Sequence, residues 1–244
     1  MQWTDDAIVL GTRRHGENAS LLELMTRRHG RHLGLVRGGH GKRLVAVLQA
    51  GNAVEATWYA RLDEHLGTYT VEGTDLRAAR MIDSAPALYG INWAAGLLRM
   101  LAERDPHEAL FETLNVLLAH LDQPVLLSPL MARFELALLG ELGFGLDLGR
   151  CAATGTTEDL IYVSPKSGRA VCRVAGEPYK DRMLALPAFL GAERLEGAET
   201  SDIEIAAGLE LTGFFLKRDV FEPRGLQLPE ARAAFLRLKL TEGA

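Results

Sequence analysis

The sequence predicts an α+β fold, with a small five-stranded β-barrel at the N-terminus and an α-helical C-terminal domain. Five short apolar runs separated by glycines fill about the first 75 residues, and from about residue 85 the apolar period becomes that of helices. The charge also divides: residues 1–80 carry 11 Lys/Arg and 9 Asp/Glu, and the remainder of the chain is acidic. We therefore expect two domains, 1–80 and 81–244, joined near residues 76–85.

The runs that predict strands are rich in β-branched, aromatic or alternating apolar residues, and glycines follow or separate them. They are Ala7–Leu10, Ser20–Thr26, Arg31–Arg37, Ala53–Ala60 and Thr68–Glu72. Five short strands within so few residues are typical of a small barrel.

The second domain is predicted from helical periodicity. Pro86 can open a helix that ends near Asp105-Pro106. Further helices are expected at 107–121, 129–143, 201–220 and 230–240. Residues 145–185 form an irregular insert, and the two apolar strands at its centre, around a Pro/Gly turn, predict a β-hairpin.

Composition limits the cellular setting. No apolar run reaches the roughly 20 residues needed to cross a bilayer. Asp5 and Asp6 precede the first apolar run, which is the wrong order for a secretory signal. Only two cysteines, Cys151 and Cys172, are present, as expected of a reducing cytoplasm and not of a disulfide scaffold.

A basic stretch stands out on this acidic protein. Between Gly11 and Val45 eight Lys/Arg face two Glu, whereas the net charge of the chain is −5. Such asymmetry indicates a surface that faces a polyanion, and an ordinary solvated surface is the alternative. Four histidines in the same stretch, His15, His29, His32 and His40, would add charge if their pKa values rose.

An ordered series of short motifs resembles the RecO family of bacterial recombinational-repair mediators. The residues that carry the likeness are Trp3–Leu10, Gly16-Glu17, Thr26–Gly30, Gly34–Gly39, Leu48–Gly51, Arg61–Gly67, Arg133–Gly140 and Tyr162–Gly168. The resemblance implies an N-terminal OB-fold, a helical C-terminal domain and a zinc-finger-like insert. It also implies DNA binding, annealing of complementary strands, contact with single-stranded DNA-binding protein, and a partner, RecR, that helps to load RecA.

OB-folds bind single strands with a positive groove and aromatic stacking platforms. The candidate DNA-binding residues are Arg14, Arg27, Arg28, Arg31, Arg37, Lys42 and Arg43. The candidate stacking residues are Trp3, Trp58, Tyr59 and Tyr69, for each of which a place in the core is the alternative. Trp58 and Tyr59 are neighbours on one strand, so one should be core and the other exposed. Gly38–Arg43 lacks the spacing of a phosphate loop, so we interpret it as a mobile basic loop that can wrap a DNA backbone, or as a plain exposed turn.

The insert departs from the pattern of the RecO family. Where many members have C-x2-C, a hairpin and C-x2-C, this chain has Cys151, Thr154, Cys172 and Ala175. A structural zinc site needs four good nitrogen or sulfur donors, so we expect no zinc and no other cofactor. A site of two cysteines completed by a distant carboxylate is the alternative.

The helical domain suggests a second binding site. Single-stranded DNA-binding proteins of bacteria end in an acidic tail with a terminal hydrophobic residue, and the resemblance places its site in this region. Leu130, Arg133 and Ala137 fall on one side of a predicted helix, so we expect them to contact the tail.

The sequence therefore predicts a non-enzymatic mediator of DNA repair and recombination, cytoplasmic and associated with the nucleoid. No G-x-S-x-G motif, HExxH motif or acidic cluster spaced for two metals is present. Two alternatives stay open: a protein-docking module whose basic strip binds an acidic partner, and a phosphate-acting hydrolase whose site residues are far apart in sequence.

Overall fold

The computed structural model describes residues 1–39, 41–191 and 200–242. The chain forms two compact units, one of Met1–Pro124 with Pro229–Ala244 and the other of Val125–Leu228. The contacts thus group the barrel with the first helices and the last one. The division into 1–80 and 81–244 stays a prediction about domains.

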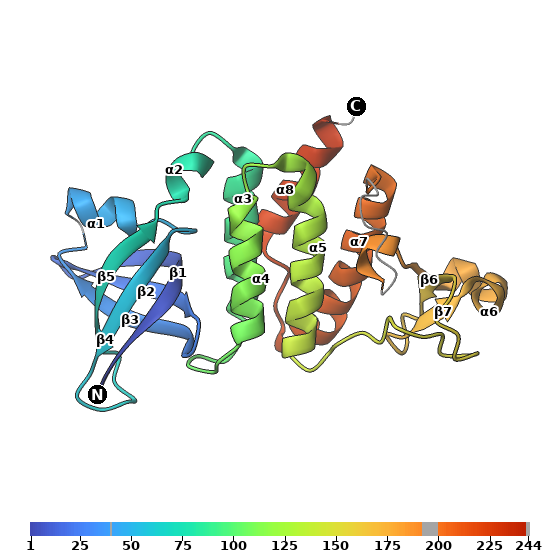
Figure 1. The fold of residues 1–244 in the computed structure, drawn as a ribbon, viewed down its shortest axis with the longest axis horizontal. Helices are drawn as coiled ribbons and strands as arrows, with labels where there is room; N and C mark the ends of the chain where they lie inside the picture. Colours follow the sequence, from blue (N-terminus) through green and yellow to red (C-terminus); the bar gives the residue numbers. More distant parts are fainter. Residues whose placement is uncertain (40, 192–199, 243–244) are drawn as a thin grey trace. The chain divides into compact units, whose positions relative to one another are not determined.

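The first unit contains the predicted five-stranded barrel (Figure 1). Its strands are β1 (Gln2–His15), β2 (Ala19–Thr26), β3 (Gly30–Arg37), β4 (Ala53–Tyr59) and β5 (Thr68–Asp75). They close in the order β1-β2-β3-β5-β4, with antiparallel neighbours except for the parallel contact between β3 and β5. The strand β1 is longer than the predicted run because it continues through an irregularity in register between Val9 and Gly11.

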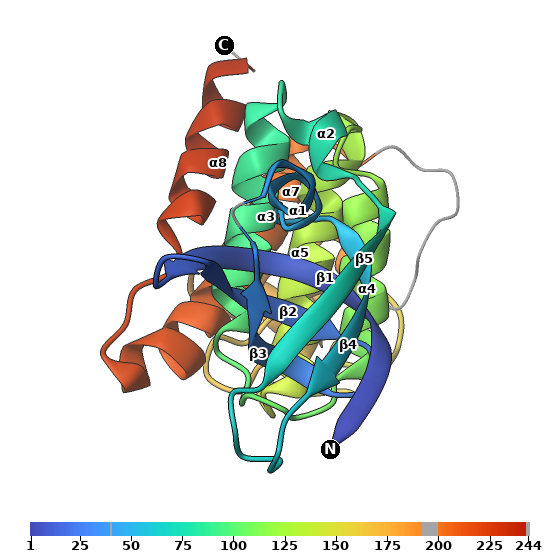
Figure 2. The same ribbon diagram turned by 90° about the vertical axis from the view of Figure 1, so that its left-hand side faces the viewer.

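The barrel is filled by alternate side chains of its strands and closed at one end by a short helix. Leu22, Leu24 and Trp58 are among the fully buried core residues. The helix α1 (Lys42–Val47) packs Leu44 and Val47 against this core. Figure 2 faces the barrel and shows α1 at one end of it and the N-terminus at the other.

The helix α1 corrects the interpretation of Gly38–Arg43 as a loop throughout, because Lys42 and Arg43 form its first turn. The apolar side chains that follow draw this segment into regular structure over the barrel core. His40, which the basic stretch includes, lies outside the described residues.

The first unit also contains the helices α2 (Ala78–Met81), α3 (Ala85–Leu98), α4 (Glu108–Ala119) and α8 (Glu230–Glu242). The Ser84 hydroxyl accepts a hydrogen bond from the Ala87 amide (3.3 Å) and so caps α3. The segment between α3 and α4 presses on the barrel at Gly30, whose φ is +63° and where a Cβ would lie 1.9 Å from the Asp105 carbonyl oxygen. Only glycine therefore fits this turn.

The second unit combines helices with the predicted hairpin. Its helix α5 (Pro124–Glu141) contains Pro129, so the predicted start of this helix at residue 129 is wrong. The hairpin β6 (Leu160–Val163) and β7 (Ala170–Cys172) is confirmed and is extended by β8 (Leu184–Ala185).

The second unit also contains these helical segments: α6 (Arg173–Gly176), η1 (Glu177–Arg182), η2 (Ala188–Leu190), α7 (Asp202–Phe215), η3 (Leu216–Phe221) and η4 (Glu222–Arg224). The side chains of Ser201 and Glu204 form a capping box at the start of α7, which explains why this helix begins at Asp202. In the parts of the chain that the structure describes, no helix is both long and apolar enough to pass through a bilayer.

Candidate nucleic-acid interface

The strand register divides the candidate DNA-binding residues between two ends of the barrel. Thr26 pairs with Gly30 where β2 turns into β3, and Ala19 pairs with Arg37 at the other end of the same two strands. We call the first the turn end, which holds Arg27, Arg28 and Arg31. We call the second the α1 end, which holds Arg14, Arg37, Lys42 and Arg43. Along β3 the two ends are roughly 23 Å apart at about 3.3 Å per residue.

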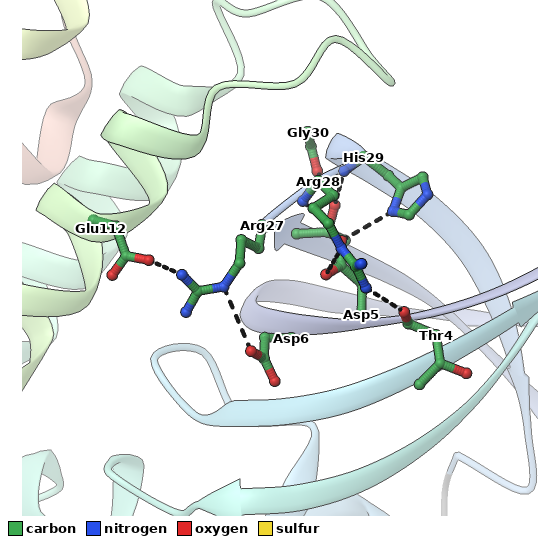
Figure 3. A network of polar contacts seen from close by, with 9 residues as sticks. Thr4, Asp5, Asp6, Arg27, Arg28, His29, Gly30 and Glu112 are labelled. Atoms are coloured by element: carbon green, nitrogen blue, oxygen red, sulfur yellow. Dashed lines mark hydrogen bonds and ion pairs between the residues drawn. The ribbon is translucent and has the colours of Figure 1, made fainter.

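Arg27, at the turn end, joins the barrel to α4. Its guanidinium forms an ion pair with Asp6 (3.4 Å) and a hydrogen-bonded ion pair with Glu112, as Figure 3 shows. It also lies over the ring of Phe111, with its central carbon 4.8 Å from the ring centroid. Two carboxylates and an aromatic face therefore occupy this arginine.

Arg28 and His29 converge on the carboxylate of Asp5, whose side chain is only 1% exposed (Figure 3). The backbone amide of Arg28 donates to the Asp5 carboxylate at 2.8 Å, and the side-chain Nε of Arg28 donates to it at 3.1 Å. His29 Nδ1 lies 2.9 Å from the same carboxylate. A buried carboxylate needs such partners, because water cannot solvate it. The side chain of Arg28 is still 64% exposed, so it keeps a face toward solvent.

Arg31 is the most enclosed of the turn-end arginines. It donates to Glu23 (3.0 Å) and to the Leu101 carbonyl oxygen (3.4 Å), and its side chain is 15% exposed. Arg99, at the end of α3, adds two hydrogen bonds of 2.9 and 2.8 Å to the other Glu23 oxygen. A single carboxylate thus holds one arginine of the barrel and one of the helices.

The α1 end is different. Arg14, Arg37, Lys42 and Arg43 are all exposed, and so is Arg13 beside them. Within the described ranges none of these five side chains takes part in a hydrogen bond or an ion pair. Because no described carboxylate pairs with them, they are the unbalanced part of the basic stretch.

The candidate stacking residues are mostly enclosed. Trp58 and Tyr69 are buried, whereas Tyr59 is 58% exposed, which confirms that Trp58 and Tyr59 face opposite sides of β4. The ring of Trp3 is stacked against that of His29, with centroids 4.0 Å apart, and against that of Trp58 at 5.7 Å. Tyr59 is therefore the aromatic residue among these four that offers an open face.

His32 does not add charge to the basic stretch. Burial, with a smaller effect from the charge of Arg104, lowers its pKa from 6.5 to about 4, so the ring is neutral near pH 7. Its Nδ1 lies 2.8 Å from the hydroxyl oxygen of Tyr69, and burial raises the pKa of that phenol. The pair is a neutral part of the barrel interior.

The three residues expected to contact the partner tail lie together on α5. Leu130, Arg133 and Ala137 are all half-buried. Arg133 donates to the carbonyl oxygen of Phe189 from Nε (3.2 Å) and Nη2 (2.8 Å). This contact fixes the direction of the guanidinium beside the apolar side of the helix.

The four positions of the insert that would hold zinc are close in space but lack donors. The Cys172 amide donates to Cys151 Sγ (3.3 Å), and the Thr154 hydroxyl lies 3.7 Å from Cys172 Sγ. Burial raises the pKa of the Cys151 thiol, but hydrogen bonds from Cys172 and Thr154 outweigh burial and lower it. Ala175 contributes a methyl group that packs against this cluster. Two thiols, one hydroxyl and one methyl do not fit a structural zinc ion.

Comparison with known proteins decides the family. The model described as Recombination protein O N terminal matches residues 1–77, and the one described as Recombination protein O C terminal matches residues 85–227. "DNA repair protein RecO" of Chelativorans sp. (strain BNC1) is 59% identical over 236 residues, which are 97% of this chain and 94% of that protein. Proteins of the same name from Mesorhizobium japonicum and Brucella abortus (strain 2308) are 56% and 52% identical over 97% of this chain, and the matches cover 92% and 95% of those proteins.

This chain belongs to the RecO family. RecO is a family of recombination mediators and not of enzymes, so the chain has a role in DNA repair and recombination. The five-stranded barrel matched by the N-terminal model is the OB-fold that the sequence predicts.

Within this RecO-family barrel, sequence reasoning missed most of the acids that hold the turn end. Asp5 and Glu112 lie 23 and 85 residues from the arginines that they contact. Arg13 belongs to the basic stretch but is not among the seven candidate residues, although it is exposed as Arg14 is. The spacing of charges along the chain does not predict ion pairs between residues this far apart, such as those of Asp5 and Glu112 with the turn-end arginines.

Proposed function

We propose that this RecO-family chain binds single-stranded DNA at the α1 end of its barrel and anneals complementary strands coated with single-stranded DNA-binding protein. The observation that carries the proposal is a group of exposed cations at this end that form no ion pair with the residues the structure describes: Arg13, Arg14, Arg37, Lys42 and Arg43. Unpaired cations held together by a fold repel one another, and phosphates relieve that repulsion while they release counterions.

The candidate residues at the turn end are less available to DNA than those at the α1 end. Arg27, Arg28 and Arg31 already contact carboxylates, so a phosphate would have to compete with a fixed carboxylate for each of them. Arg28 is the best placed of the three, because most of its side chain faces solvent. DNA contact by these residues stays a prediction.

Annealing requires no covalent chemistry. Two strands repel through their phosphates, and a surface that neutralises one of them lowers the barrier to pairing. A protein with this role acts on the bacterial chromosome, so the proposal places the chain in the cytoplasm, at the nucleoid.

Two measurements test this proposal. The affinity for a single-stranded oligonucleotide should fall linearly with salt on a log–log scale. The chain should also accelerate the pairing of complementary oligonucleotides coated with the cognate binding protein. No binding at low salt, together with binding to an acidic protein chain, would replace the proposal by the docking-module alternative. A magnesium-dependent phosphate activity that is lost with one acidic residue would replace it by the hydrolase alternative.

We further propose that Leu130, Arg133 and Ala137 on α5 hold the acidic tail of the single-stranded DNA-binding protein. The half-buried apolar side of the helix would take the terminal hydrophobic residue, and the guanidinium of Arg133 would pair with a carboxylate. We expect Arg133→Ala to weaken binding of the tail peptide roughly tenfold. Arg150→Ala, at an exposed position of the same unit, is the control with the same change of charge. Equal binding by the two variants would rule out this role of Arg133.

We also propose that the chain, together with RecR, helps to load RecA. The support is membership of the RecO family, and the test is the rate at which RecA assembles on a coated single strand with the chain and RecR together or with each alone. The loading role requires that the pair act faster than either protein.

The insert is proposed to fold without zinc, because its four positions do not offer four donors. Metal analysis of the purified chain should therefore find no stoichiometric zinc. One zinc ion per chain would show instead that Cys151 and Cys172 recruit a distant ligand.

A further inference from the structure

Two neighbouring cavities on the first unit run beside the last part of β1. The larger, of about 480 Å³, lies between β1, β2 and the second half of α3. The smaller, of about 160 Å³, lies between β1 and α1. Thr12 and Arg13 line both cavities, so the two lie side by side along β1, and we call them together the β1 groove.

The charges of the β1 groove favour an anion. Arg13 and Arg14 line it without an ion pair within the described ranges, and Arg99 lines the larger cavity. Glu23 is the acid among its described lining residues, and both Arg31 and Arg99 contact that carboxylate. The carboxylate of Glu23 is therefore already paired with arginines other than those on β1.

The groove also presents two amide side chains in fixed orientations. The Asn92 amide nitrogen donates to the Leu88 carbonyl oxygen (2.7 Å), and the Gln49 amide nitrogen donates to the Val45 carbonyl oxygen (2.8 Å). Each nitrogen is thus held by its own helical segment. The amide oxygens accept no hydrogen bond from the described residues, and both side chains line the groove, one in each cavity.

This combination distinguishes a nucleic-acid strand from a simple anion. Phosphates accept hydrogen bonds and so need the arginines, but they offer nothing to an amide oxygen. Bases carry N–H donors on their edges, which an amide oxygen accepts. An acidic peptide could supply such donors only from its backbone N–H groups, and membership of a DNA-repair family favours the nucleic-acid strand.

We propose that the β1 groove seats a short segment of single-stranded DNA, with phosphates on Arg13 and Arg14 and base edges against Asn92 and Gln49. This inference rests on the proposed binding of single strands and adds the path of the strand and the way in which its bases are sensed. Because the groove holds only a short segment, the flanking nucleotides stay free to pair with a complementary strand.

The test compares three variants on two probes at low salt. The probes are an ordinary single-stranded oligonucleotide and an abasic one of the same length. Arg13→Ala should weaken binding of both probes roughly tenfold, because a charged hydrogen bond to phosphate is lost, and Arg13→Lys should restore most of it. The double variant Asn92→Ala/Gln49→Ala should weaken binding of the ordinary probe roughly fivefold and leave the abasic probe unchanged.

The control is Arg150→Ala, which removes the same charge from an exposed position of the second unit. All of the substituted positions are exposed, and thermal melts should show that every variant is folded. If wild type binds the ordinary probe and Arg13→Ala binds it equally well, the groove proposal fails while single-strand binding stands. An equal effect of the double variant on both probes would rule out the base contacts. If wild type binds neither probe, the proposed function itself fails.

Discussion

The turn end and the α1 end of the barrel carry similar numbers of cations but use them differently. At the turn end, Arg27, Arg28 and Arg31 each contact a carboxylate, and the contacts of Arg27 and Arg31 also join the barrel to α4 and to the segment after α3. At the α1 end the cations are exposed and unpaired within the described ranges. A basic stretch in a sequence can therefore contain two kinds of arginine, one that holds the fold together and one that is available to a partner.

The largest effect should come from breaking the turn end at Glu23. We expect Glu23→Ala to lower the free energy of unfolding by about 3 kcal/mol, because Arg31 then stays enclosed without its carboxylate. Urea denaturation measures this. Glu55→Ala, which removes an exposed carboxylate from β4, is the control and should change stability by less than about 0.5 kcal/mol. A loss below about 1 kcal/mol for Glu23→Ala would mean that the turn-end pairs do not hold the fold.

A second effect concerns the barrel interior near the turn end. Since the pKa of His32 is lowered from 6.5 to about 4, its neutral form stabilises the fold fully above pH 6.5. That contribution is lost as pH falls from 6.5 through 4, because the unfolded chain binds the proton more readily. It amounts to about 2 kcal/mol after allowance for partial solvation.

Urea denaturation between pH 7 and pH 4 tests this contribution. The His32→Gln variant should show a shallower loss of stability than wild type over this range. His15→Gln, at an exposed histidine of the α1 end, is the matched control. Parallel profiles for wild type and His32→Gln would contradict the assignment of a buried neutral ring.

At the α1 end the expected effect is on binding and not on folding. Replacing Arg14, Arg37, Lys42 and Arg43 by Gln should lower the salt slope for single-stranded DNA by about 3, at about 0.7 per phosphate contact. The melting temperature should change little, since these exposed side chains form no hydrogen bond or ion pair with the described residues. Replacing Arg27, Arg28 and Arg31 by Gln should give the opposite result, with a lower melting temperature and a smaller change of slope. Equal slopes for the two variants would remove the distinction between the ends.

The smallest effect is expected at Tyr59. This exposed ring pairs through β4 with Gln2 and Thr68, far from α1. Tyr59→Ala should therefore change the affinity for a single strand less than twofold, as fluorescence anisotropy can measure. A base stacked on a ring contributes about 1–3 kcal/mol, so a loss of tenfold or more would extend the binding surface beyond the α1 end.

How much could be predicted from the sequence depends on the range of the interactions. The strands and the hairpin follow from alternation and turn residues, which act over a few positions. The helix α1 is too short to show a period, and Leu44 and Val47 become helical because the barrel core covers them. The positive surface was predicted from composition. The division of its residues into paired and exposed arginines could not be predicted, because Glu112 and Arg99 come from helices that are distant in the chain.

The charges along β1 have a consequence for the approach of DNA. Near its start the strand carries Asp5 and Asp6, which pair with turn-end arginines, and near its end it carries Arg13 and Arg14, which form no ion pair with the described residues. At physiological ionic strength the Debye length is about 8 Å, well below the roughly 23 Å between the two ends. A distant polyanion is therefore attracted to one end of β1 and barely to the other. Its first encounter is steered toward the α1 end before any contact forms, and this acceleration of association should fade as salt is added.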